Sequence, residues 1–179
     1  MHTLIVVLAQ YLLYALALVA AVVWLILGRR GKAELAVQAV LGLALVGLGI
    51  LVAGHLHTDP RPFVHDPHST PFFPHPADNG FPSDHSAAAG LLTGLVLWWK
   101  RLVGVVVGAG AALVAWSRVA AHVHHAQDVV AGLLIGAAAG ALAVWFVILL
   151  VGAANRRGYR MGVLALTTAD RHDRKRDSR

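Results

Sequence analysis

The sequence contains no cysteine, and charged residues make up only 13% of its 179 positions. The absence of cysteine excludes disulfides and thiolate metal sites. Hydrophobic residues reach 58%, and the mean hydropathy is +0.66. A soluble domain of this size cannot bury that much apolar surface, so lipid must be the solvent for most of the chain. We therefore expect one membrane domain, with no second folded unit.

Five apolar segments are each close to the roughly 20 residues needed to cross a bilayer. They are about Thr3–Gly28, Ala33–Gly54, His85–Trp99, Leu102–Ala121 and Val129–Ala153, of which the third is short. This pattern predicts an all-α integral membrane helical bundle with about five transmembrane helices. Glycines recur at helical spacing, as at Gly132, Gly136 and Gly140 on the last segment, which indicates close helix packing.

Basic residues alternate with the apolar segments. Short basic runs at 29–32, 100–101 and 156–160 follow the first, third and fifth segments. By the positive-inside rule these joints are cytoplasmic, so we expect the N-terminus outside and the joints 55–84 and 122–128 on the exterior. Residues 1–160 would form the membrane-embedded domain. Residues 161–179 are expected to be a basic, disordered cytoplasmic tail.

Three polar clusters lie where the apolar segments meet the exterior. They are Arg61-Pro62, Pro82-Ser83-Asp84-His85, and Ser117-Arg118 followed by His124 and Asp128. Arg61 and Arg118 are the only basic residues outside the membrane-flanking runs and the tail. A charge at the end of a membrane helix is costly to keep, which indicates a function. Two guanidinium groups and two imidazoles suit a phosphate ester or anhydride.

Each cluster alone also has a purely structural explanation. Ser83 is a natural N-cap and Asp84 complements the helix dipole, although neither role explains His85 in the first turn. Free N–H groups at this helix N-terminus, with the hydroxyl and the imidazole, would form a site for a phosphate oxygen. The spacing from His124 to Asp128 permits the carboxylate to hold Nδ1–H of the imidazole. The other nitrogen would then be free to act as a base or a nucleophile.

In combination, the three clusters resemble the signature of the type 2 phosphatidic acid phosphatase family. Their order, their spacing and their shared exterior face all match, and the resemblance covers about residues 33–150. The family core usually has six helices, whereas five are expected here. The resemblance implies a membrane lipid phosphatase that needs no metal and no cofactor.

The resemblance also implies a role for each matching residue. His124 would attack phosphorus and become a phosphohistidine, and Asp128 would orient it. His85 would protonate the leaving oxygen and later activate the hydrolytic water. The non-bridging oxygens would be held by Arg61, Ser83 and Arg118, together with backbone N–H groups of the 83–85 turn.

Two positions depart from the family pattern. Gly54 stands where a lysine usually opens the first motif, with His55 and His57 nearby as candidate substitutes, and Asp84 stands where glycine is usual. The stretches 59–64 and 73–78 are nevertheless similar to the bacitracin-resistance branch of the family, the undecaprenyl-pyrophosphate phosphatases. This branch implies hydrolysis of undecaprenyl pyrophosphate at the outer face of a bacterial inner membrane, which recycles the lipid carrier of peptidoglycan synthesis.

Two alternatives stay open. The same chemistry could act on phosphatidylglycerol phosphate or phosphatidic acid. From another class, nine of the eleven histidines lie in the two outer joints or, for His85, directly beside one, and neutral imidazoles suit a divalent-metal carrier or sensor. The two arginines argue against a cation as ligand. Nucleic acid is not an expected partner, because the net charge of +6 comes from basic runs that reflect topology.

Overall fold

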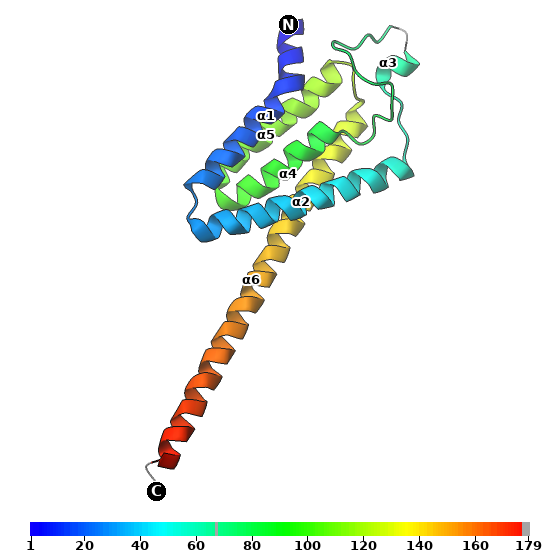
Figure 1. Cartoon of the computed structure of the whole chain (residues 1–179). Coiled ribbons are helices and arrows are strands. Elements are labelled where there is room, and N and C mark those ends of the chain that lie inside the picture. Colours follow the sequence, from blue (N-terminus) through cyan, green and yellow to red (C-terminus); the bar gives the residue numbers. More distant parts are fainter. Residues whose placement is uncertain (67, 177–179) are drawn as a thin grey trace. The chain divides into compact units, whose positions relative to one another are not determined.

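The computed structural model describes residues 1–66 and 68–176, and within them every regular element is a helix (Figure 1). The elements are α1 (His2–Ile26), α2 (Arg29–Leu56), α3 (Pro62–His65), α4 (Asp84–Trp99), α5 (Arg101–Ala120) and α6 (Ala126–Arg176). The five long helices correspond to the five apolar segments. The all-α prediction is confirmed, and the short α3 is an addition to it.

The chain divides into two compact units, which are Met1–Val144 and Trp145–Arg179. The first contains α1 to α5, the start of α6 and all the predicted site residues. The second contains the remainder of α6, which ends at Arg176 and not at the expected Ala153. No proline interrupts the sequence there, and residues with good helix propensity dominate it. The expected disorder of the tail stays a prediction, and residues 177–179 lie outside the described part.

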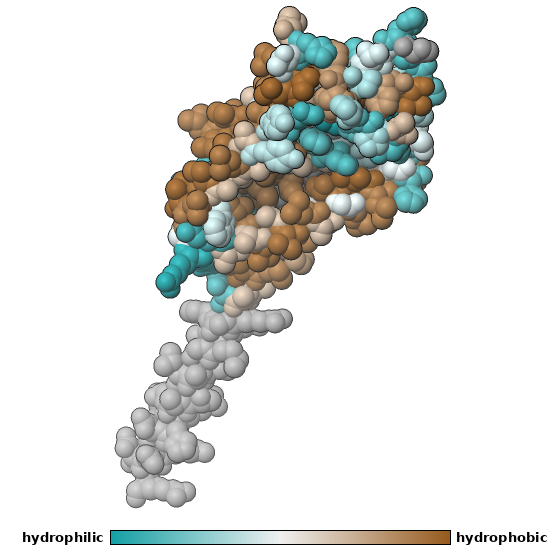
Figure 2. Space-filling model, turned by 45° about the horizontal axis from the view of Figure 1, so that its top comes forward, coloured by the Kyte–Doolittle hydropathy of each residue, from teal (hydrophilic) through white to brown (hydrophobic). Residues whose placement is uncertain are grey.

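The helices have the length and surface of membrane spans. Four of them are long and apolar enough to cross a bilayer, namely α1, α2, α5 and α6 as far as Arg156, whereas α4 has only 16 residues. Large apolar side chains such as Val40, Leu102 and Leu134 are exposed, as suits contact with lipid. Figure 2 shows a hydrophobic surface over the helices, with most hydrophilic residues gathered at the end that carries the loops.

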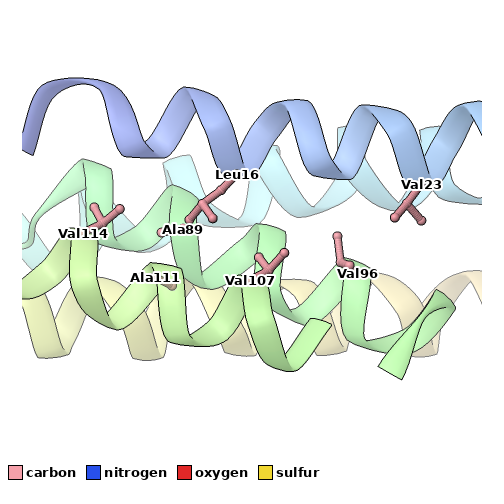
Figure 3. Close-up of a cluster of buried hydrophobic side chains, with 7 residues drawn as sticks. All are labelled: Leu16, Val23, Ala89, Val96, Val107, Ala111 and Val114. Carbon is pink, nitrogen blue, oxygen red and sulfur yellow. The ribbon is translucent and has the colours of Figure 1, made fainter. Parts of the chain in front are cut away.

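The short helix α4 lies against α1, α2 and α5. One cluster of buried side chains joins α1, α4 and α5 (Figure 3), and it consists of Leu16, Val23, Ala89, Val96, Val107, Ala111 and Val114. Two of these residues are alanines, which let the helix backbones approach one another closely. The ends of these helices are thereby held in fixed positions, which matters because the polar clusters lie at those ends.

Two glycines let α6 pack directly against α4, as their helical spacing predicted. A Cβ on Gly136 would collide with the carbonyl oxygen of Ala87, and a Cβ on Gly132 with that of Ser83. Both obstacles are backbone atoms, so a larger residue would push the helices apart. At the same contact the N–H of Ser83 donates to the carbonyl oxygen of Asp128 at 3.0 Å. The glycines therefore place the second and third polar clusters side by side.

The long loop between α2 and α4 is folded back on itself. The side-chain oxygen of Asn79 accepts the N–H groups of Asp59 at 2.9 Å and Phe81 at 3.1 Å. An antiparallel β-bridge joins Pro60 and Asn79 beside these bonds. The loop contains the short α3, whose first residue is Pro62, a position at which proline costs no hydrogen bond. These contacts hold Arg61 beside His124 and bring the chain back to the start of α4.

Candidate active site

His124 lies in the short loop between α5 and α6, and only 4% of it is exposed. Its Nδ1 is 3.3 Å from Oδ2 of Asp128, which is fully buried in the first turn of α6. The same oxygen accepts the N–H of His125 at 2.8 Å, so the start of the helix fixes the carboxylate. A carboxylate placed at Nδ1 favours the tautomer with the proton on that nitrogen. The lone pair of His124 is then on Nε2.

Arg61 faces this second nitrogen of His124. Its Nη1 lies 3.2 Å from Nε2 of His124 and donates to the carbonyl oxygen of Val123 at 2.8 Å. Its Nε donates to Oδ1 of Asp78 at 2.7 Å. A guanidinium has no acceptor, so Nε2 of His124 must accept, which agrees with the tautomer set by Asp128. A phosphoryl group placed here would meet a lone pair and a cation together.

The N-terminus of α4 forms another side of the site. Ser83 is fully buried, and its hydroxyl accepts the N–H of Ser86 at 3.5 Å as an N-cap. Asp84 is exposed. His85 follows in the first helical turn, half-buried, and lines a cavity together with Arg118. A helix N-terminus is a favourable position for an anion because its dipole and free N–H groups point at the ligand.

Arg118 is in the last turn of α5 and is only 2% exposed. Its Nη1 donates to the carbonyl oxygen of Ala9 at 3.3 Å, and its Nη2 donates to Nε2 of His75 at 2.9 Å. The guanidinium carbon lies 5.5 Å from the centre of the Phe73 ring. Arg118 is thus held from α1 on one side and from the long loop on the other.

A cavity of about 340 Å³ opens beside Arg118. It is lined by residues of α1 and of the loop before α4, with one residue each from α4 and α5: Gln10, Tyr11, Tyr14, Phe73, Pro74, His75, His85 and Arg118. Arg61, Ser83 and His124 do not line it. The cavity therefore lies on the side of the site that contains His85 and Arg118.

The structure brings all the predicted site residues to one end of the first unit. These are Arg61, Ser83, His85, Arg118, His124 and Asp128. No role was predicted for His75 and Asp78, which hydrogen-bond to Arg118 and Arg61, although the stretch 73–78 was singled out. The candidate substitutes for the missing lysine behave differently. His55 and His57 are exposed, and among the described residues the side chain of His55 contacts the carbonyl oxygen of Leu51 and that of His57 contacts the ring of Phe81.

The surroundings of two loop histidines keep them neutral. Burial is the main cause that lowers the pKa of His124 below 6.5, and the charges of Arg118 and Arg61 act in the same direction against the opposing effect of Asp128. Burial, with the charges of Arg61 and Arg118, lowers the pKa of His75 to about 4. Both imidazoles are therefore uncharged at neutral pH, with a lone pair on one nitrogen.

The pKa of His124 leads to a prediction for the pH dependence of activity. If this residue attacks phosphorus it must be neutral, so activity is present above its pKa and is lost as the pH falls through it. Because the pKa of His124 is lowered, we expect the acidic limb of kcat/KM to lie below pH 6.5. The measurement is initial rates in detergent from pH 4 to 8, with unfolding followed at each pH. An acidic limb clearly above pH 6.5 would contradict the prediction.

Asp59, His125 and Asp128 form a second cluster, whose potential ligand atoms lie within 4.8 Å of one another. Most of these atoms are already paired within the protein, although Oδ1 of Asp128 is buried and has no hydrogen-bond partner among the described residues. Oδ2 of Asp59 is 2.9 Å from Nδ1 of His125, and it accepts the side-chain amide of Gln127 at 2.6 Å. A cation would have to displace these bonds. The cluster therefore supports the α5–α6 loop. A metal ion bound here would make phosphate release sensitive to EDTA.

Two arginines, two histidines and a carboxylate gathered at one end of a helical membrane bundle form a set of groups that suits a phosphate ligand. Comparison with known families agrees. The sequence profile of the PAP2 superfamily matches residues 35–151, and the chain belongs to this superfamily.

Among its relatives, YbjG of Escherichia coli (strain K12) is 35% identical over 129 residues, which are 72% of this chain and 64% of YbjG. The chain thus spans slightly less than two thirds of that protein. The undecaprenyl-diphosphatase BcrC of Bacillus subtilis (strain 168) is 28% identical over 134 residues, 74% of this chain and 68% of BcrC. The crystal structure of LpxE from Aquifex aeolicus has the same fold, with a TM-score of 0.64 at 22% identity over 80% of this chain and 82% of LpxE.

Proposed function

We propose that this protein hydrolyses undecaprenyl pyrophosphate to undecaprenyl phosphate and inorganic phosphate through a phosphohistidine at His124. The observation that carries the proposal is the placement of this imidazole. Nδ1 faces the buried carboxylate of Asp128, and Nε2 faces the guanidinium of Arg61. That arrangement places a lone pair that can attack phosphorus next to a cation that can bind a phosphoryl oxygen. The name of the BcrC relative supports the choice of lipid.

The reaction has two steps. First, Nε2 of His124 attacks the terminal phosphorus, the bond to the bridging oxygen breaks, and His85 gives its proton to the leaving undecaprenyl phosphate. Second, His85 takes a proton from water, the water attacks the phosphohistidine, and the P–N bond breaks. Inorganic phosphate leaves and His124 is restored. Fixed donors stabilise the charge that develops on the transferred group, which these residues can do without a metal ion.

Arg61, Ser83 and Arg118 would surround the transferred group. All three are at most 6% exposed, so their interactions with a phosphate are little screened by water. The N–H groups of the first turn of α4 add further donors. This assignment also accounts for the two buried arginines, which a cation carrier would not need.

The charge pattern supports an extracytoplasmic site in a bacterial inner membrane. The basic joints 29–32 and 100–101 lie at the N-terminal ends of α2 and α5, and the site lies at the C-terminal end of α5. Trp99 packs against Gly31, so the two basic joints meet at the end of the bundle remote from the site. Under the positive-inside rule that end is cytoplasmic. The prenyl chain could then stay in lipid while the diphosphate reaches the site.

The direct test is phosphate release from undecaprenyl pyrophosphate by the detergent-purified protein, with and without excess EDTA. We expect release that EDTA does not reduce, because the site uses arginine and histidine donors. Release that EDTA abolishes would contradict the metal-free mechanism. Release from phosphatidylglycerol phosphate or phosphatidic acid in place of the prenyl lipid would keep the mechanism and change the substrate. Inactivity on all these lipids, with tight zinc binding, would favour the metal-carrier alternative.

A further inference from the structure

His75 lies in the loop before α4, and the mechanism above gives it no role. Its Nε2 accepts Nη2–H of Arg118 at 2.9 Å. Its ring centre is 6.2 Å from that of His124, edge to face, and 6.1 Å from that of Phe73. It also lines the cavity beside Arg118. His75 therefore hydrogen-bonds to Arg118, which we propose binds phosphate, and lies next to His124, the proposed nucleophile.

The hydrogen bond from Arg118 fixes the protonation of His75. A guanidinium can only donate, so Nε2 of His75 carries a lone pair, and the proton of the neutral imidazole is on Nδ1. Nδ1 is buried and forms no hydrogen bond of good geometry within the described residues, although the backbone of the adjacent Pro76 is close enough to raise the pKa of the ring. A buried donor left unpaired is costly, so its presence calls for an explanation such as a bound group. The Nε of Arg118 is buried and unpaired in the same way.

The position of the cavity indicates which part of a substrate these donors would meet. The cavity is lined by His75, His85 and Arg118, whereas the nucleophile His124 does not line it. In the proposed mechanism His85 protonates the leaving group, so the leaving group lies on the cavity side. In a diphosphate ester the leaving group carries a phosphate, and in a monophosphate ester it carries none. A donor on this side can therefore distinguish the two substrate classes.

We propose that Nδ1–H of His75 binds the phosphate that is not transferred, which makes the site selective for diphosphate over monophosphate esters. This inference rests on the proposed function and deepens it. Arg118 lies between the two phosphates, and His75 holds it there through Nε2. The neutral imidazole supplies a directed donor without another charge beside two arginines. His75 thus provides a phosphate contact in a chain that has Gly54 in place of the usual lysine.

The test is calorimetric titration of the detergent-purified full chain, in EDTA, with inorganic pyrophosphate and with inorganic phosphate. We expect the wild type to bind pyrophosphate more tightly than phosphate. His75→Ala should lose about tenfold in pyrophosphate affinity, the effect of one hydrogen bond to a charged group, with little change for phosphate. His65→Ala is the matched control, because His65 is an exposed histidine of the same loop. Thermal unfolding confirms that each variant is folded.

Two conservative variants separate substrate contact from positioning of Arg118. His75→Asn places an amide N–H near the position of Nδ1 and loses the acceptor for Arg118. His75→Gln places an amide oxygen near the position of Nε2 and loses the donor. We expect the His75→Asn variant to keep the preference for pyrophosphate over phosphate and the His75→Gln variant to lose it. The opposite result, or an equal loss for both anions in His75→Ala, would overturn the inference.

Turnover separates this inference from the proposed function. If the wild type releases phosphate from undecaprenyl pyrophosphate but His75→Ala keeps the full ratio of kcat/KM between that lipid and phosphatidic acid, the inference fails and the proposed function stands. If the wild type acts on neither lipid and still binds pyrophosphate through His75, the proposed function fails and the diphosphate site remains.

Discussion

Replacing His124 with alanine is expected to reduce phosphate release by on the order of 10⁴-fold or more, because no other group can form the covalent intermediate. The variant should still fold. The oxygen of Asp128 that faces His124 retains the N–H of His125, and Arg61 retains Val123 and Asp78 as partners. The measurement is phosphate release from undecaprenyl pyrophosphate at equal protein concentrations, with thermal unfolding of both proteins in the same detergent.

The matched control for this variant is His122→Asn. His122 is in the same short loop, with a positive φ of 60°, and its side chain lies near the carbonyl oxygen of Thr70. Asparagine tolerates this left-handed backbone conformation better than most residues, so the loop should keep its shape. We expect activity close to that of the wild type. Full activity in His124→Ala would show that another residue is the nucleophile, and loss of activity in the control would show that the loop had been disturbed.

The apolar runs were sufficient to predict five long helices because hydrophobic length alone determines which segments can cross a bilayer. They were less informative about helix ends. α2 begins at Arg29, four residues before its apolar run, and α6 extends past Ala153. In both places polar residues with good helix propensity continue the helix beyond the lipid-facing segment. The short α3 was missed because four residues in a proline-rich loop carry no periodicity.

The six predicted site residues were found by a resemblance, since spacing along the chain does not say which helix ends meet. The structure supplies a physical reason for their meeting. Gly132 and Gly136 allow α6 to touch the backbone of α4, and this contact joins Ser83 to Asp128. His75 could not be singled out by pattern, because it is one of several histidines in a long loop. Only its burial and its bond to Arg118 distinguish it from exposed neighbours such as His65.

Asp128→Asn is expected to reduce kcat by about 10³- to 10⁴-fold, the effect seen when a histidine is held in the wrong tautomer. Asparagine has nearly the shape of aspartate, but the oxygen of Asp128 that faces Nδ1 of His124 is also the one that accepts the N–H of His125. If the amide nitrogen takes that position, it donates to Nδ1, moves the imidazole proton to Nε2 and loses the bond to His125. If the amide oxygen takes it, both bonds remain but the negative charge that stabilises the imidazolium is lost. The loss should therefore appear in the chemical step and not in substrate binding. Rapid-quench measurement of phosphohistidine formation tests this directly.

Asp59→Asn is the matched control, since Asp59 pairs with His125 as Asp128 pairs with His124, but at a histidine that the mechanism does not use. We expect only a small loss in this variant. The double variant Asp128→Asn with His124→Ala should be no less active than His124→Ala alone, because the carboxylate acts only through the imidazole. A further loss in the double variant would show that Asp128 has a second role, such as holding α4 against α6. A similar loss in Asp59→Asn and Asp128→Asn would indicate that both carboxylates act by supporting the loop.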